Sequence, residues 1–186
     1  MELISTDTPD LRYPIGQFSP PDTTVTQDQL DRWIDDIAAL PSDLRSTVSP
    51  LTENQLDTPY RPGGWTVRQV VHHLPDSHMN SLIRFKWALT EDRPLIKAYD
   101  EKGWAVLPDC RKPIGHSLDF LDALHRRWVD LLRGLSGPQL RREFVHPESG
   151  PVELAVTVGA YAWHGRHHLA HVERLIEREG WNGRVR

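Results

Sequence analysis

Residues 161–177 read YAWHGRHHLAHVERLIE and combine an amphipathic helical pattern with the densest group of histidines in the chain. From Leu154 to Ile176, apolar residues recur at the spacing of an α-helix, which Gly180 is placed to end. Ten histidines spread evenly over 186 residues would put about 0.4 into an eight-residue window. One such window holds four: His164, His167, His168 and His171. This cluster is the main functional signal in the sequence.

The four imidazoles project into a sector of about 100° on an ideal helix, so they share one face. Two histidines four residues apart can direct ring nitrogens at a single ion, which is why helical His-x-x-x-His pairs bind zinc. Spacing alone leaves two pairs open, His164 with His168 and His167 with His171. A third ligand has to come from another helix, where the adjacent His72 and His73 are the candidates.

The same cluster has a plainer interpretation. Neutral histidines can fill interior positions with both ring nitrogens hydrogen-bonded, and four close together can also form a solvated helix face or a dimer contact. For a single histidine this interpretation is the better one. A group of four that faces a second His-His pair favours a metal site instead.

Helical periodicity extends to three further segments, so the sequence predicts an all-α four-helix bundle. The expected helices run from Thr26 to about residue 50 with a break or kink at Pro41, from the capping box of Thr66 and Gln69 to about residue 90, over 115–134, and over 154–179. Pro75 predicts a kink beside His73, because proline has no N–H for the preceding turn.

Long irregular segments complete the predicted organisation. A connection over 90–114 separates the second and third helices, and residues 143–154 fit either a small hairpin or an irregular loop. We divide the chain into an extended N-terminal arm (1–25), a bundle domain (26–180) and a C-terminal tail (181–186).

Composition excludes several functions. The net charge of −4 disfavours nucleic acid as a partner, and the single cysteine, Cys110, excludes an intrachain disulfide. With a mean hydropathy of −0.52 and no apolar run near 18 residues, no membrane span is expected. The first ten residues, MELISTDTPD, do not resemble a secretion signal, so we expect a cytoplasmic protein.

Four stretches closely resemble the DinB-like superfamily, and in particular its YfiT branch of metal-dependent hydrolases. They are YPIG (13–16), LDTPYRPGGWTVRQVVHHLPDSHMN (56–80), RFKWALTED (84–92) and YAWHGRHHLAHV (161–172). The resemblance covers the chain from about Tyr13 to about Glu179. It implies a four-helix bundle that holds one divalent metal ion per chain, with zinc as the first choice and nickel as the alternative.

The resemblance also indicates which histidines bind the metal ion. The family's W-T-x-x-x-x-x-x-H pattern falls on Trp65 and His73, and its paired histidines fall on His164 and His168. It further implies a homodimer, and an activity that is either hydrolysis or transfer of a low-molecular-weight thiol such as bacillithiol to an electrophile. The nucleophile would then be metal-activated water or a metal-bound thiolate, and the substrate a small molecule.

Residues near the predicted ligands are assigned more modest roles. Asp76 and Asn80 can orient a ligand or hold substrate, and Asn80 also fits an ordinary solvated position. We expect His72 to pack or form a hydrogen bond. His167 and His171 fit partners of the ligands, the mouth of a cleft, or an exposed basic stripe.

Four other residues complete the set. Trp65 and Trp163 are expected to serve packing, His125 to be a hydrogen-bonded core residue, and Cys110 to have no catalytic role. Gly165 occupies the position where a His-Glu-x-x-His protease has its glutamate, so peptide hydrolysis is disfavoured. The leading hypothesis is a metalloenzyme acting on a small molecule. Its rivals are a metal-stabilised structural or interaction bundle and a metal-free bundle.

Overall fold

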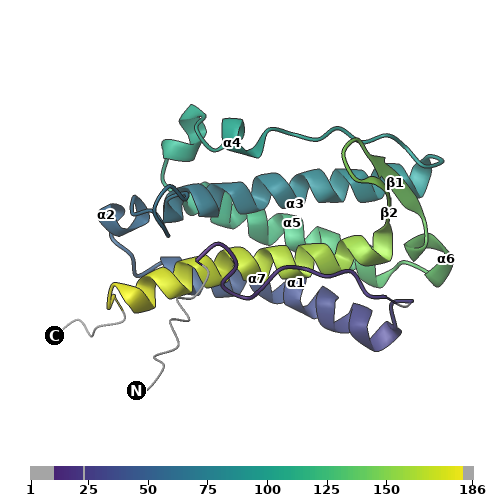
Figure 1. The fold of residues 1–186 in the computed structure, drawn as a ribbon, viewed down its shortest axis with the longest axis horizontal. Coiled ribbons are helices and arrows are strands. Elements are labelled where there is room, and N and C mark those ends of the chain that lie inside the picture. The colour runs from purple at the N-terminus through teal and green to yellow at the C-terminus, as the bar shows by residue number, and fades with distance from the viewer. Residues whose placement is uncertain (1–10, 23, 182–186) are drawn as a thin grey trace, which may run out of the picture.

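The computed structural model describes residues 11–22 and 24–181, and nearly all of its regular structure is helical (Figure 1). In chain order the elements are α1 (Gln27–Val48), α2 (Glu53–Leu56), α3 (Val67–Thr90), α4 (Glu101–Trp104), the 3-10 helix η1 (Pro108–Arg111), α5 (Gly115–Arg133), α6 (Gly137–Leu140), β1 (Glu143–His146), β2 (Gly150–Glu153) and α7 (Leu154–Arg178). The predicted all-α class is confirmed, with one small sheet added.

The four long helices, α1, α3, α5 and α7, form the predicted bundle. α1 packs against α5 and α7, and α3 packs against the same two helices. The first and second long helices therefore lie diagonally across the bundle, unlike a simple up-and-down arrangement in which consecutive helices are neighbours. This order places α3 beside α7 and so brings His73 to the histidine cluster of α7.

A local signal fixes the start of α3. The Thr66 side chain accepts a hydrogen bond from the Gln69 backbone N–H, and the Gln69 side chain accepts one from the Thr66 N–H, which is the predicted capping box. The helix then continues through Pro75 to Thr90 without interruption. α1 likewise contains Pro41 in its interior.

The connection between α3 and α5 contains only α4 and η1 as short helical turns, as the sequence predicted. Of the two alternatives for residues 143–154, the hairpin is correct: β1 and β2 pair antiparallel, with Phe144 opposite Val152. A bridge between Leu95 and Val145 attaches the start of the connection to this hairpin. The connection is thereby held over one side of α3 (Figure 1).

The core is divided along the bundle axis into two apolar clusters. One includes Phe85, Trp128 and Val158, and the other includes Leu44 and Leu175 with their neighbours. Between them the inward positions of the long helices carry a polar layer made largely of buried histidines: His73, His78, His125, His167, His168 and His171. The bundle is therefore interrupted at mid-height by imidazoles.

The described part of the N-terminal arm, residues 11–22, lies against α7 (Figure 1). The Trp163 indole N–H donates a hydrogen bond to the Gly16 carbonyl oxygen over 3.1 Å, and the Tyr13 and His167 rings lie 5.9 Å apart between centroids. The arm thus reaches the histidine layer.

Residues 1–10 and most of the predicted tail, 182–186, lie outside the described residues. In the part of the chain that is described, no helix is long and apolar enough to cross a membrane.

Close packing of α7 on α1 explains two glycines in α7. A Cβ added at Gly159 would lie 2.7 Å from the Trp33 ring, and one at Gly165 would lie 2.5 Å from a Leu40 methyl carbon. A side chain at either position would require Trp33 or Leu40 to move. Packing against α1 therefore leaves little room for a glutamate at position 165.

We predict that Gly159→Ala lowers the free energy of unfolding by about 1–3 kcal/mol, because the rigid Trp33 ring has to move. Gly115→Ala is the matched control, since a Cβ there meets nothing within 4 Å. It should stabilise the protein by about 0.4–1 kcal/mol through the lower entropy of the unfolded chain. Urea denaturation measures both, and equal effects of the two variants would contradict this packing account.

Candidate metal centre

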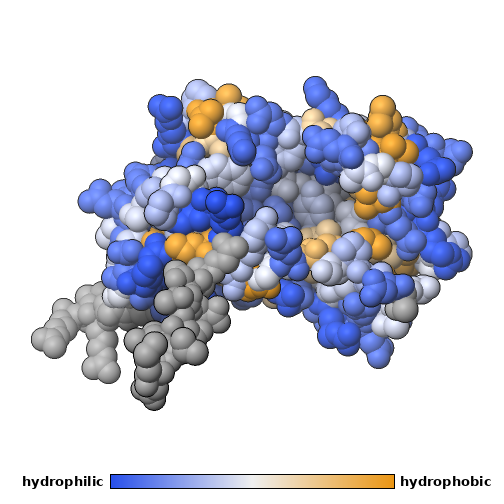
Figure 2. Space-filling view, viewed as in Figure 1, coloured by the Kyte–Doolittle hydropathy of each residue, from blue (hydrophilic) through white to orange (hydrophobic). Residues whose placement is uncertain are grey.

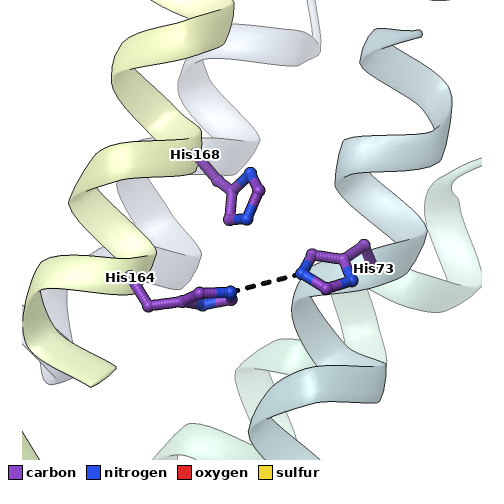
Figure 3. A group of neighbouring side chains, drawn as sticks. All are labelled: His73, His164 and His168. Carbon is purple, nitrogen blue, oxygen red and sulfur yellow. Dashed lines mark hydrogen bonds between the residues drawn. The ribbon is translucent and has the colours of Figure 1, made fainter. Parts of the chain in front are cut away.

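Three histidines from two helices converge in the polar layer. His164 and His168 lie one turn apart on α7, and His73 reaches toward them from α3 (Figure 3). One ring nitrogen from each lies within 4.8 Å of those of the other two. The closest pair is His73 Nε2 and His164 Nε2, at 3.2 Å. Within residues 11–22 and 24–181, this is the one group of three or more metal-binding side chains so arranged.

The rings are held in a largely water-free environment. His73 and His168 are 4% and 8% exposed, while His164 is partly exposed. Burial lowers the pKa of His73 to about 4. Burial and the neighbouring imidazoles also lower the pKa values of His164 and His168. All three rings are therefore neutral near pH 7, which is the form whose lone pair binds a metal.

This donor set fits a divalent cation. Three neutral imidazoles from two rigid helices match the ligand number of catalytic zinc sites, which leave a further position for water or substrate. Among the described residues, the buried Nδ1 atoms of His168 and His167 have no hydrogen-bond partner. Buried ring nitrogens are normally satisfied, so the histidine layer has room for a partner from outside these residues.

Trp65 forms part of the wall of the site. Its ring lies 4.6 Å from the His73 ring and 6.1 Å from the His168 ring, and it is nearly parallel to the latter at 19°. Trp163 stacks on His167 at 4.4 Å. The prediction that both tryptophans serve only packing is therefore incomplete, because each contacts a histidine of the layer. The position of Trp65 just before the α3 capping box explains its contact with His73.

Two pockets meet at His164. One, of about 680 Å³, is lined by Tyr99, Tyr161 and the β1–β2 turn, and the other, of about 430 Å³, is lined by Tyr60, Trp65 and the remaining α7 histidines. Trp163, Glu101 and Lys102 border both pockets. Figure 2 shows this face of the molecule hollowed near its centre. His164 and His168 of the three-histidine group therefore line a cleft large enough for a small molecule.

His167 and His171 line this cleft and are buried. Their Nε2 atoms lie 3.0 Å apart, and His171 stacks on Tyr60 at 4.0 Å. The alternative of an exposed basic stripe is wrong, because the residues are 8% and 3% exposed. The sequence left two histidine pairs open. Of these, His164 and His168 are the pair that His73 approaches.

The other expected neighbours stand outside the group of three. His72 faces away and bonds the Ser117 hydroxyl at 2.7 Å and the Lys112 carbonyl oxygen at 3.1 Å, which confirms its prediction. The Asn80 side chain donates to the Asp76 backbone carbonyl at 2.8 Å and so makes a local helix contact. Burial, with help from the charge of Asp109, raises the pKa of Asp76 to about 6.

The single thiol is not poised for chemistry. Cys110 is buried in η1, where it donates to the Trp104 carbonyl oxygen at 3.3 Å. Burial and the nearby Asp109 and Asp76 raise the pKa of Cys110 to about 11. The thiol therefore stays protonated near pH 7, which agrees with the prediction that it has no catalytic role.

Sequence reasoning missed one contact of the site. His78, a buried residue of α3, has its Nε2 atom 3.1 Å from His164 Nδ1, within hydrogen-bond distance. His125 was predicted to be a hydrogen-bonded core residue, which is confirmed, and its partner is His78. A histidine on the apolar face of each of two neighbouring helices was the signal that could have predicted their contact.

This chain belongs to the DinB superfamily, whose model matches residues 36–172. A Bacillus mycoides (strain KBAB4) protein named "Putative metal-dependent hydrolase" is 56% identical over 172 residues, which cover 92% of this chain and 99% of the relative. A Bacillus cereus (strain B4264) protein with the same designation shows the same identity and coverage.

A solved structure is also similar. YfiT from Bacillus subtilis, described as "a probable metal-dependent hydrolase with an unusual four-helix bundle topology", superimposes with a TM-score of 0.89 at 48% identity. The match covers 92% of this chain and 98% of YfiT. The resemblance found in the sequence motifs is thereby confirmed.

The buried histidines predict that acid destabilises the fold. Burial lowers the pKa values of eight histidines, so below the ordinary value of 6.5 the unfolded chain binds more protons than the folded one. Their contribution to stability is complete above pH 6.5 and is lost as the pH falls toward about 4. The raised pKa values of Asp36, Asp76 and Glu173 act in the opposite direction, but these are three groups against eight.

Urea denaturation at a series of pH values, with EDTA in every sample, measures this effect without metal linkage. The free energy of unfolding should fall steadily from about pH 7 to about pH 4.5, with a slope that corresponds to several protons taken up on unfolding. A stability that does not change over this range would show that the histidine layer is not desolvated as described.

Proposed function

We propose that this protein is a metal-dependent hydrolase that acts on a small molecule, with His73, His164 and His168 as the ligands of one divalent ion. The observation that carries the proposal is the approach of these three neutral imidazoles to within 4.8 Å, with His164 and His168 lining a cleft. The names of the relatives in Bacillus mycoides and Bacillus cereus, and the description of YfiT, support it.

The chain's own residues would bind and orient the reactants. His73 and the α7 pair hold the ion, which when bound supplies a Lewis acid that polarises a substrate carbonyl and acidifies water. Trp65 packs on two of the ligands and shields them from solvent. The cleft on either side of His164 accommodates the two parts of the substrate on opposite sides of the scissile bond.

Zinc is our first choice for the ion and nickel the second, because imidazole ligands suit both. A homodimeric, cytoplasmic protein remains our prediction. The metal-stabilised structural bundle is disfavoured, because His164 borders two pockets and the site is therefore open, whereas structural zinc sites are closed.

Transfer of a low-molecular-weight thiol is the second candidate reaction. The observation in its favour is the meeting of two pockets at one ligand, since a transfer reaction needs room for a thiol and for an electrophile. In that case the thiol would take the place of water at the ion, and no protein nucleophile would be needed. The buried, protonated Cys110 agrees with either reaction.

Metal analysis tests the ligand assignment. We expect one equivalent of divalent metal in the purified protein and its loss in His73→Ala and in His168→Ala, because the two imidazoles that remain do not make a durable site. His72→Ala is the matched control: it removes a buried histidine beside His73 that bonds Ser117 and Lys112 instead. Metal retained in both ligand variants would reject the assignment.

An activity screen tests the reaction. Simple esters and amides are offered to the metal-loaded protein with and without a low-molecular-weight thiol, and a thiol with an electrophile is offered in parallel. We expect turnover in the absence of thiol, its loss with a chelator, and a reduction of at least about 100-fold in His168→Ala. Turnover that requires the thiol would support the transferase, and turnover unchanged in His168→Ala would contradict both reactions.

A further inference from the structure

Three histidines on three helices form a continuous hydrogen-bonded row that ends on a backbone carbonyl. His164 Nδ1 lies 3.1 Å from His78 Nε2, and His78 Nδ1 lies 2.8 Å from His125 Nε2. His125 Nδ1 lies 2.6 Å from the carbonyl oxygen of Ile37 in α1. We call these three residues and the carbonyl the histidine row. It connects the candidate metal centre to the far side of the bundle.

The sequence of α1 explains why this carbonyl is available. The α-helical donor to the Ile37 carbonyl would be the backbone N–H of residue 41, four positions later. That residue is Pro41, which lies inside α1 and has no N–H. The Ile37 carbonyl is therefore left without its helical donor, and the His125 ring supplies one.

The carbonyl also sets the direction of every hydrogen bond in the row. A carbonyl oxygen can only accept, so the proton of His125 is on Nδ1 and its Nε2 is an acceptor. The proton between His125 and His78 then belongs to His78 Nδ1, which leaves His78 Nε2 as an acceptor. His164 must in turn donate from Nδ1. With one proton on each ring, no other arrangement satisfies all three contacts.

We propose that the histidine row fixes the Nδ1–H tautomer of His125, His78 and His164, and so presents the lone pair of His164 Nε2 to the metal. The proposal rests on the proposed function for its consequence, because Nε2 is the atom of His164 that faces His73. His78 and His125 are then positioning residues, which act on the ion only through His164.

Packing holds the row in place. His78 and His125 are 0% and 1% exposed, so water does not compete for their ring nitrogens. The His78 ring lies edge-on to Trp128 at 5.7 Å and to Tyr161 at 5.1 Å, with interplanar angles of 89° and 84°. A ring confined on two sides in this way cannot turn over, which would put a ring carbon in the place of each nitrogen. The orientation of His164 is thereby fixed through its neighbour.

Nitrogen NMR of the histidine rings reads the tautomers directly. Long-range proton–nitrogen spectra of the ¹⁵N-labelled, metal-free protein should show Nδ1 protonated and Nε2 unprotonated in His78 and His125. Assignment uses the loss of one ring signal set in His78→Gln and in His125→Gln. A proton on Nε2 of either residue would overturn the proposal, whether or not the protein binds metal.

Zinc affinity, measured by competition with a chromophoric chelator, tests the consequence. We expect His125→Leu to weaken zinc binding about 10-fold, the lower end of the effect of residues that orient a metal ligand. His125→Gln should restore most of the affinity, because its amide can donate to the Ile37 carbonyl and accept from His78. His72→Leu is the matched control, since it removes a buried histidine that is also bonded at both nitrogens.

The outcomes separate the two proposals. Zinc affinity unchanged in a folded His125→Leu, or equally reduced in His72→Leu, would overturn the role of the histidine row. A wild-type protein that binds no zinc would contradict the proposed metal site, while the ring spectra would still decide the tautomers. If His125→Leu does not fold, His78→Leu provides the second variant, because it removes the link between His125 and His164. The same reduction in zinc affinity is expected, and an unchanged affinity in the folded variant would overturn the role of the histidine row.

Discussion

The constraint on which this structure depends is the burial of uncharged imidazoles between two apolar halves of a helix bundle. A buried polar ring is costly unless each nitrogen finds a partner, and in the part of the chain that the structure describes these rings bond mainly one another and the Ile37 carbonyl oxygen. The four long helices therefore have to meet in one register, because a shift of any one would leave several nitrogens unsatisfied. Stability and metal binding share the same geometry.

The order of the helices in the bundle brings the three histidines of the candidate metal centre together. Because α3 and α7 are neighbours while α1 and α3 are diagonal, His73 faces His164 and His168 directly. α5 and α1 stand behind them and supply His125 and the Ile37 carbonyl. His164 thus borders a cleft on one side and has a hydrogen-bonded support on the other. Rigid elements on all sides favour a preorganised site rather than one assembled on binding.

Much of this could be predicted from the sequence. The four helices, the Thr66 capping box and the exclusion of His72 from the group of three histidines follow from spacing and local chemistry, which act over a few residues. The pair of His164 and His168 could not be preferred from helical geometry, because His167 and His171 have the same spacing; the family motif made that choice. The roles of Trp65 and Trp163 were underestimated, since aromatic residues near helix ends look alike whether they pack in a core or beside a ligand.

The sequence by itself determined that the chain forms helices, that histidines gather on one face of the last one, and that Pro41 and Pro75 remove N–H groups from two others. These are properties of neighbouring residues and the bonds that they can form. Only the tertiary structure decided that the carbonyl freed by Pro41 meets His125, and that His78 links His125 to His164. Contacts between residues 37, 78, 125 and 164 depend on which helices are adjacent and how they are rotated, and that is set by the packing of the whole core.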